Sequence, residues 1–227
     1  MAKYPFLLFD ADNTLFDFDT ANENALRFCC EQNDIPFSED TFARYEAHNS
    51  ALWHDFDRGL ATKEFIVVER FRRFLAELGL SRDAEKCNHD HLDSLSRSTL
   101  LVPHAAEVCQ VLSRTHEIYL VTNAVASVQN RRLGLSALAP FVRDAFISET
   151  AGAAKPSAAY FDYVFEHIDG ITRENCIVIG DSLTSDMQGA VNYSLPCCWF
   201  NPKRLPAPEG LPINYEISDL RELFDIV

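Results

Sequence analysis

Two pairs of aspartates stand directly after apolar segments of the sequence. Asp10 and Asp12 follow a short apolar run near the start of the chain, and Asp181 and Asp186 follow another run much further along. If the fold brings these four carboxylates together, they repel one another unless a cation lies among them. Hard oxygen ligands with an open position suit Mg²⁺. We therefore expect a magnesium site, with Asp10 and Asp181 binding through carboxylates, Asp12 through its backbone carbonyl, and Asp186 through a water molecule or by orienting a lysine.

A site of this kind can hydrolyse a phosphate monoester. Asp10 can attack phosphorus in line and form an aspartyl-phosphate. Asp12 can protonate the leaving oxygen and later take a proton from the water that hydrolyses the intermediate. The metal ion would neutralise the acids and the incoming phosphate together. The residues thus predict a magnesium-dependent phosphatase with Asp10 as nucleophile and Asp12 as general acid and base.

Three further polar residues are candidates for holding the phosphate. Thr122 and Asn123 follow an apolar run, and their side chains and backbone N–H groups can bind the equatorial phosphoryl oxygens. Lys155 can bind the negative charge that develops in the transition state. Taken singly, a Thr-Asn pair is typical of a turn and a lysine before proline is typical of a surface. It is the ordered set, each member at the right kind of boundary between elements, that indicates a phosphate site.

The elements that must position these residues alternate between strand and helix patterns. We expect strands at residues 4–9, 118–121, 145–148, 176–179 and 197–200, with helices between the later ones. Pro156 suits the first turn of a helix over residues 157–167. Such alternation predicts an α/β fold with a doubly wound parallel sheet, a Rossmann-like core. The carboxyl ends of its strands form one edge, and three of these ends carry Asp10/Asp12, Thr122/Asn123 and Asp181.

The stretch from about residue 20 to 98 shows helical patterns and no strand pattern. Ser38, Thr62 and Ser81 are typical N-caps, and Gly79 is typical of a helix end. We expect an inserted all-helical cap of about four helices, placed so that it can lie over the catalytic edge as a lid. The expected domains are a core of residues 1–16 and 101–227 and a cap of residues 17–100.

The overall composition limits the partners. The 227 residues carry a net charge of −14, which repels nucleic acid polymers and anionic membranes. A small anionic substrate stays compatible if the site supplies local positive charge. Without a signal peptide pattern or a membrane-length apolar run, we expect a cytoplasmic protein. The composition does not indicate an oligomeric state.

The cysteines and a histidine pair are not expected to bind metal. Seven cysteines occur without a CxxC pair, which favours reduced, buried thiols. His89 and His91 lie in a polar helical stretch without an acidic partner at ligand spacing. We therefore expect both histidines to be exposed on the surface.

The motifs resemble those of the haloacid dehalogenase-like hydrolase superfamily. Asp10-Ala-Asp-Asn-Thr-Leu15 resembles its first motif, Thr122 its second, Lys155-Pro156 its third, and Gly180-Asp181 through Asp186 its fourth. The resemblance extends over essentially the whole chain. It implies the subclass whose all-helical cap follows the first motif.

Four stretches carry a closer resemblance to one subgroup: Phe9 to Phe16, Leu52-Trp53 through Gly59, Ile147-Ser-Glu149 with Lys155-Pro156, and Cys198-Trp199-Phe200-Asn201. This subgroup is that of the bacterial pyrimidine 5′-nucleotidases, which dephosphorylate UMP, dUMP and dTMP. Two residues depart from its pattern, since Asn13 replaces a usual Glu and Ala124 replaces the Gly of Thr-Asn-Gly. The resemblance implies a pyrimidine nucleoside 5′-monophosphate as substrate. Trp53 and Phe56 offer flat faces on which a base can stack, although both can equally be core residues of the cap.

Other functions share parts of the pattern. A true haloacid dehalogenase would lack an acid at the position of Asp12, because its ester intermediate needs no leaving-group proton. A receiver-type signalling module uses similar residues but is only about 120 residues long and has no helical insertion. A phosphatase or phosphomutase acting on sugar phosphates or other small phosphometabolites stays open as the alternative.

Overall fold

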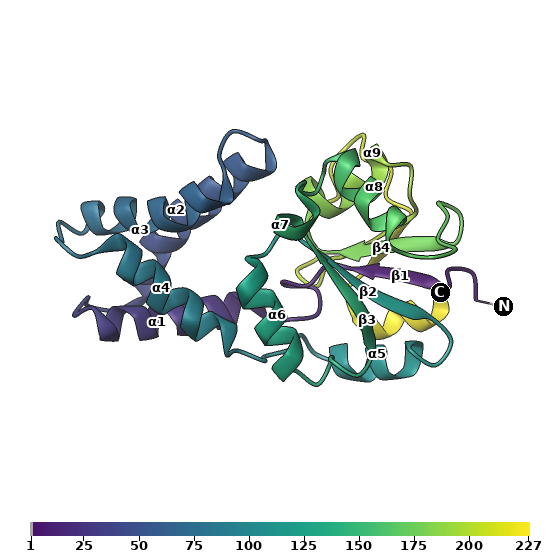
Figure 1. Ribbon diagram of the computed structural model, residues 1–227, viewed down its shortest axis with the longest axis horizontal. Coiled ribbons are helices and arrows are strands. Elements are labelled where there is room, and N and C mark those ends of the chain that lie inside the picture. Colours follow the sequence, from purple (N-terminus) through teal and green to yellow (C-terminus); the bar gives the residue numbers. More distant parts are fainter. Residues whose placement is uncertain (1) are drawn as a thin grey trace. The chain divides into compact units, whose positions relative to one another are not determined.

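Six parallel strands form the sheet that carries most of the predicted site residues. We describe the protein from a computed structural model, which places residues 2–227. In sheet order, the strands are β3 (Val142–Ile147), β2 (Glu117–Thr122), β1 (Phe6–Phe9), β4 (Cys176–Gly180), β5 (Cys197–Phe200) and β6 (Tyr215–Ile217). β1 lies between β2 and β4 (Figure 1). The chain order reverses at β1, and the crevice at such a switch point is where doubly wound sheets bind ligands.

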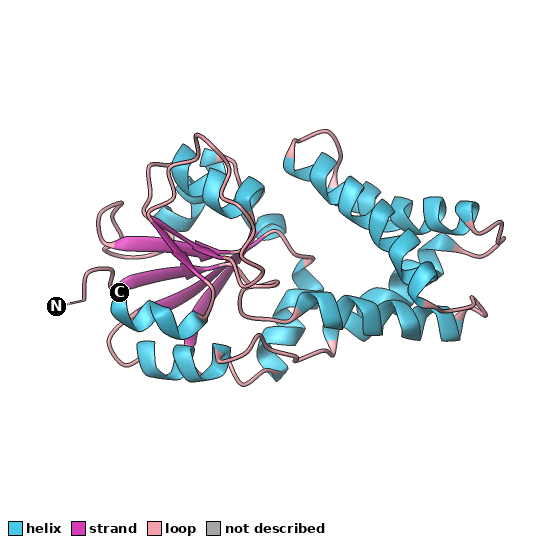
Figure 2. Cartoon of the chain, turned by 180° about the vertical axis from the view of Figure 1, so that it is seen from behind, coloured by secondary structure: helices cyan, strands magenta, loops and turns pink. Residues whose placement is uncertain are grey.

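Helices cover both faces of this sheet (Figure 2). They are α5 (Ala105–Leu112), α6 (Ala126–Leu135), α7 (Ser148–Ala151), α8 (Ala158–Glu166) and α9 (Gln188–Asn192), with a π-turn, η1 (Leu183–Met187), and a 3₁₀ helix, η2 (Leu220–Asp225). The predicted α/β architecture, with a doubly wound parallel sheet and a helical insertion after β1, is confirmed.

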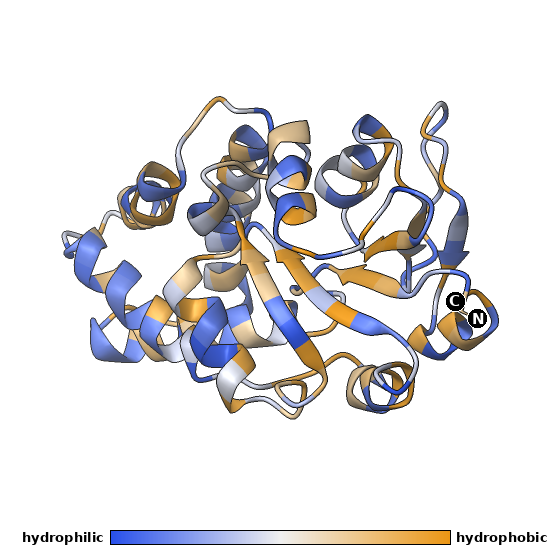
Figure 3. Cartoon of the chain, turned by 45° about the vertical axis from the view of Figure 1, so that its right-hand side comes forward, coloured by the Kyte–Doolittle hydropathy of each residue, from blue (hydrophilic) through white to orange (hydrophobic). Residues whose placement is uncertain are grey.

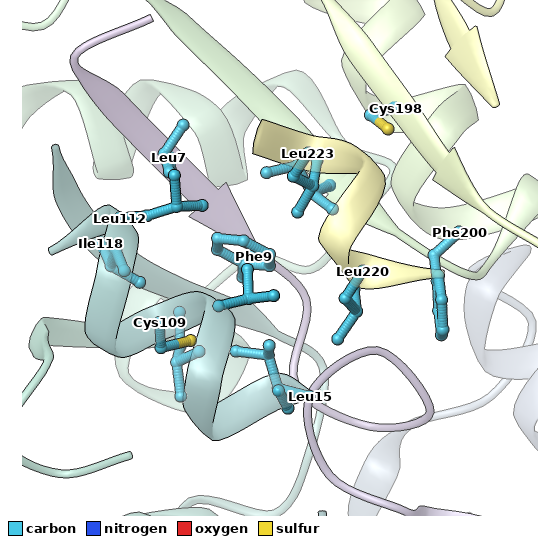
Figure 4. Packing of buried hydrophobic residues seen from close by; sticks show 14 of the residues in the cluster. Leu7, Phe9, Leu15, Cys109, Leu112, Ile118, Cys198, Phe200, Leu220 and Leu223 are labelled. Carbon is cyan, nitrogen blue, oxygen red and sulfur yellow. The ribbon is translucent and has the colours of Figure 1, made fainter. Parts of the chain in front are cut away.

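The side chains of β1 show why the sheet needs cover on both faces. Successive residues of a strand point to opposite faces. Leu7 and Phe9 therefore pack with α5 and η2, whereas Phe6 and Leu8 pack with α8 and α9. Figure 4 shows Phe9 among side chains of α5 and η2. The central strands β1 and β4 are accordingly buried along their whole length, and hydrophobic residues dominate the middle of the sheet (Figure 3).

The structure divides into two compact units. One comprises the chain through Phe18 together with Thr99–Val227, and contains the sheet. The other, Asp19–Ser98, is built from the helices α1 (Phe18–Gln32), α2 (Glu39–Asp57), α3 (Lys63–Glu77) and α4 (Ala84–Ser96). These bounds differ by two residues from those expected from the sequence.

Most of the expected helix caps form, and two predictions were wrong in detail. The side chains of Ser38 and Thr62 accept hydrogen bonds from the backbone of α2 and α3 as predicted. Asp83, not Ser81, caps α4, because its carboxylate accepts from two backbone N–H groups of the first turn. Pro156 lies before α8 rather than in its first turn, because Ser157 takes the N-cap position.

A buried polar network connects all four helices of the helical unit. Arg70 of α3 donates to Asn49 of α2 and lies 3.4 Å from Nδ1 of His91 on α4. Nε2 of His91 lies 3.0 Å from Oδ1 of Asn22 on α1. The prediction that His91 is exposed was therefore wrong, since it is fully buried, whereas His89 is exposed as predicted. Burial and the nearby Arg70 guanidinium hold the pKa of His91 well below its usual range.

Two expectations from composition can be compared with the structure. All seven cysteines are free and buried, as predicted. Among residues 2–227, no helix combines the length and apolar character that crossing a membrane requires.

Candidate active site

Asp10 stands at the carboxyl end of the central strand and is almost fully buried. Its backbone N–H donates to the carbonyl of Ile179, which continues the pairing of β1 with β4. Thr14 donates through Oγ1 to Oδ2 of Asp10 at 3.4 Å, from the turn that follows the strand. Asn13, within this turn, has a φ of 60°. Asparagine tolerates this left-handed conformation better than most residues. Asn13 therefore suits the turn at a position where the pyrimidine 5′-nucleotidases usually have Glu.

Lys155 reaches the carboxylate of Asp10 from the other side. Its Nζ lies 2.7 Å from Oδ1 of Asp10, 2.6 Å from Oδ1 of Asp186 and 2.6 Å from the carbonyl oxygen of Val121. The side chain is 1% exposed. Burial alone would lower the pKa of Lys155, but the two carboxylates outweigh burial and raise it above its ordinary value. Lys155 therefore carries its positive charge inside the site.

The side chain of Asn123 contacts the backbone of Lys155. Its Nδ2 donates to the carbonyl oxygen of Lys155 at 2.9 Å, and its Oδ1 accepts from the Lys155 backbone N–H at 3.0 Å. One N–H and the oxygen of the side-chain amide are thus both engaged by the Lys155 backbone. The side chain therefore fixes the Lys155 loop to the end of β2.

Thr122 ends β2 beside this loop. Its Oγ1 accepts a hydrogen bond from the backbone N–H of Ala124 at 3.1 Å, which shapes the turn after the strand. The backbone of Ala124 does not enter the left-handed region. The turn therefore accommodates alanine where the resembling subgroup has glycine.

Asp186 is fully buried and lies across the end of β4. Oδ1 binds Lys155, and Oδ2 accepts from the backbone N–H of Ser182 at 3.0 Å. A Cβ on Gly180 would lie only 2.3 Å from Oδ2 of Asp186. Glycine is therefore required at the end of β4, because any side chain would displace the carboxylate that binds the lysine.

Asp10, Asp181 and Asp186 form an acidic cluster. One carboxylate oxygen of each lies within 4.8 Å of those of the other two. Burial first, and then the charge of Asp186, raise the pKa of Asp181 to about 7. The same two causes raise the pKa of Asp10 well above its usual value. A cation stabilises the ionised form of carboxylates that are buried and repel one another.

The donor set fits Mg²⁺. All three side chains offer oxygen ligands, which hard divalent cations prefer. Four aspartates, counting Asp12, stand near two cationic side chains, so the ionised site keeps a net negative charge that a divalent ion can neutralise.

Asp12 is separate from this cluster. Its carboxylate is one-quarter exposed and pairs with Arg132 of α6, with 2.5 Å between Oδ1 and Nη1. Sequence reasoning did not identify Arg132, and it also missed the roles of Thr14 and Gly180 beyond their place in the motifs. No local signal could reveal Arg132, because 120 residues separate it from Asp12.

We expect Gly180→Ala to weaken Mg²⁺ binding by about tenfold or more, because the new methyl group displaces the carboxylate of Asp186. Removing a group that supports the ligands of a metal site typically lowers metal affinity by about 10–100-fold. Isothermal titration calorimetry with MgCl₂ measures the change.

Gly134→Ala is the matched control. Gly134 lies within α6 and has no positive φ, and a Cβ added there would meet no atom within 4 Å. This variant should keep its Mg²⁺ affinity and gain about 0.5–1 kcal/mol of stability. Wild-type Mg²⁺ affinity in a folded Gly180→Ala protein would contradict the packing argument.

Comparison with known proteins agrees with the fold and the motifs. The chain is 39% identical over 228 residues to the HAD-hydrolase YfnB of Bacillus subtilis, covering 100% of this chain and 97% of that protein. The crystal structure of YfnB, described as bound to magnesium and as revealing interdomain movement, matches with a TM-score of 0.94 at 37% identity and covers 99% of both chains.

Two further relatives carry the name pyrimidine 5′-nucleotidase. PynA of Streptococcus pneumoniae is 30% identical, covering 98% of this chain and 94% of its own. YjjG of Escherichia coli is 29% identical, covering 97% of this chain and 96% of its own. The family model for a haloacid dehalogenase-like hydrolase matches residues 5–193, which include all the site residues described above. The chain belongs to the haloacid dehalogenase-like hydrolase family.

Proposed function

We propose that the protein is a Mg²⁺-dependent phosphatase that hydrolyses small phosphate monoesters through an aspartyl-phosphate on Asp10. The observation that supports this most directly is the placement of Asp10. Its carboxylate ends the central strand, is held by Thr14 and Lys155, and belongs to the acidic cluster. A carboxylate fixed in this way is oriented for in-line attack.

The reaction proceeds in two displacements. In the first, an oxygen of Asp10 bonds to phosphorus while the ester P–O bond breaks, and Asp12 gives its proton to the leaving oxygen. In the second, water attacks phosphorus, Asp12 takes a proton from that water, and the bond to Asp10 breaks to release phosphate. Lys155 stabilises the negative charge on the phosphoryl group in both steps. Asp10, Asp181 and the backbone carbonyl of Asp12, supported by Asp186, would hold Mg²⁺, whose charge would neutralise the phosphate and the acids.

Mg²⁺ should raise the melting temperature more at about pH 8 than at about pH 5.5. In the ion-free protein the pKa of Asp181 is raised from 3.8 to about 7, so its folded form keeps a proton that the unfolded chain loses. Stability of the ion-free protein therefore falls as pH rises from about 4 to 7, and Mg²⁺ restores it once Asp181 is ionised. Differential scanning calorimetry with MgCl₂ or EDTA measures both effects.

The matched variant is Asp181→Asn, which lacks the titrating group. It should lose most of the Mg²⁺ stabilisation and this part of the pH dependence. An equal Mg²⁺ effect at both pH values in the unsubstituted protein would argue against Asp181 as a ligand.

Asp10→Asn should abolish turnover, because the covalent step loses its nucleophile. Asp12→Asn should lower kcat/KM by about 10²–10⁴-fold for alkyl phosphates and much less for p-nitrophenyl phosphate, because a good leaving group needs little protonation. The comparison uses kcat/KM because this parameter does not include later hydrolysis of the intermediate. Equal losses on both substrates would count against Asp12 as the general acid.

We further propose that the substrate is a pyrimidine nucleoside 5′-monophosphate. The names of PynA and YjjG support this, as does the near-complete coverage of both chains. Asp10, Lys155 and the acidic cluster recognise the phosphoryl group, which every candidate substrate shares. Selectivity must therefore come from residues that contact the rest of the substrate.

Trp53 and Phe56, near the end of α2, are the candidates for that contact. Their rings pack edge to face with centroids 5.5 Å apart, and Nζ of Lys63 lies 5.6 Å from the centroid of Phe56. Both rings are only partly buried, and neither belongs to the buried core cluster of the helical unit. They are therefore better suited to stacking on a base than core aromatics would be.

Phosphate release measured over nucleotides and sugar phosphates with Mg²⁺ should be fastest, by kcat/KM, for UMP, dUMP or dTMP. Phe56→Ala and Trp53→Ala should each raise KM for these nucleotides by about 10-fold or more, because stacking of one base contributes about 1–3 kcal/mol. The kcat for p-nitrophenyl phosphate should stay near its original value.

The melting temperature of each variant separates contact with substrate from support of the fold. A parallel loss on nucleotide and aryl phosphate, together with a lower melting temperature, would mean that the rings are structural. A native preference for sugar phosphates would contradict the nucleotide proposal, and isomer formation without free phosphate would indicate a phosphomutase.

A further inference from the structure

We propose that Arg132 is a positioning residue that holds the carboxyl group of Asp12 for proton transfer. The proposal rests on the function proposed above, in which Asp12 is the general acid and base. Arg132 lies on α6, and its side chain is fully buried, yet its Nη1 reaches Oδ1 of Asp12 at 2.5 Å. A guanidinium stays charged in a protein, and burying it is costly unless a carboxylate faces it. The pair is therefore a fixed feature of the site.

Arg132 is itself held in place. The Phe16 ring centroid lies 4.5 Å from Cζ of Arg132, so the ring faces the guanidinium. Oε1 of Gln129, one turn earlier on α6 and also fully buried, lies 3.4 Å from Nη1. Contacts from a ring and from a neighbouring side chain restrict the rotamers of a long arginine. The Nη1 atom that meets Asp12 is thus preorganised.

Arg132 contacts both ends of the turn after β1. Asp12 and Phe16 face each other across this turn, and the backbone N–H of Asn13 donates to the Phe16 carbonyl at 2.8 Å. The guanidinium pairs with the carboxylate of Asp12 and packs on the ring of Phe16. The turn and its catalytic side chain are consequently fixed by one residue of a helix 120 residues away.

The geometry leaves one oxygen of Asp12 for chemistry. Arg132 binds Oδ1, and the Asp12 side chain remains 24% exposed. We assign proton transfer to the other oxygen, Oδ2. Because the Arg132 side chain has no exposed surface, it is shielded from substrate. Arg132 therefore acts through Asp12, unlike Lys155, whose Nζ binds the nucleophile directly. Loss of Arg132 should impair leaving-group protonation and spare the nucleophilic attack.

The test is the leaving-group dependence of kcat/KM for Arg132→Met, which removes the charge and keeps much of the volume. We expect kcat/KM for an alkyl phosphate to fall at least about tenfold more than kcat/KM for p-nitrophenyl phosphate. General acid catalysis contributes roughly 10²–10⁴-fold in total, and loss of Arg132 should remove only a part of it. Arg132→Lys, which keeps a cation, should recover part of the difference. Arg114→Met, at an exposed position of the same unit, should change neither value.

A double-mutant cycle identifies the residue through which Arg132 acts. In an Asp12→Asn background, Arg132→Met should not change the ratio of kcat/KM for the alkyl phosphate to kcat/KM for p-nitrophenyl phosphate any further. Equal losses on both substrates, or a further change of the ratio in the Asp12→Asn background, would overturn the proposal. If Arg132→Met does not fold, as judged by its melting temperature, Arg132→Lys and Arg132→Gln are compared in the same way.

The result also separates the two proposals. If Asp12→Asn changes the leaving-group ratio and Arg132→Met does not, the phosphatase mechanism stands and the role of Arg132 is wrong. If Asp12→Asn leaves the ratio unchanged, Asp12 is not the general acid and both proposals fail.

Discussion

The site depends on a buried lysine bound between two buried aspartates. Nζ of Lys155 binds Asp10, Asp186 and a backbone carbonyl at the end of β2, so one ammonium group joins three strand ends. Each of these charged groups alone would be costly to bury. Together they compensate one another, and the acidic excess that remains is what a divalent cation neutralises. Removing Lys155 would take from Asp10 and Asp186 the cation that both of them bind.

The parallel sheet makes this arrangement possible. Phe9 of β1 lies opposite Leu120 of β2 and Ile179 of β4, so the chain leaves all three strands at nearly the same level. The loops then supply the fine placement. Asn123 fixes the backbone of Lys155, and Gly180 leaves the space that the carboxylate of Asp186 occupies. The hydrophobic faces of the sheet hold the strands, while a few polar contacts decide where the reactive atoms lie.

Two buried cationic side chains, Lys155 and Arg132, bind different carboxylates in this site. Lys155 binds Asp10 and Asp186 of the acidic cluster, whereas Arg132 binds the carboxylate of Asp12. In the mechanism proposed above, attack on phosphorus and proton transfer to the leaving group therefore depend on separate contacts. The helical unit uses buried charge differently, because Arg70 meets Asn49, Asn88 and His91 rather than a carboxylate. There the polar groups join four helices, and the chemistry belongs to the sheet edge.

The sequence by itself determined the fold class, the helical insertion and the acidic residues at the strand ends. Those features follow from local patterns, namely alternation of apolar segments, caps such as Thr62, and motifs whose members stand close together. Only the tertiary structure decided that Asn123 holds the Lys155 loop, that His91 is buried and that Arg132 pairs with Asp12. The physical reason is that these contacts join residues far apart in sequence. Periodicity reports which face of an element is apolar, but not which polar side chain of another element will meet it there.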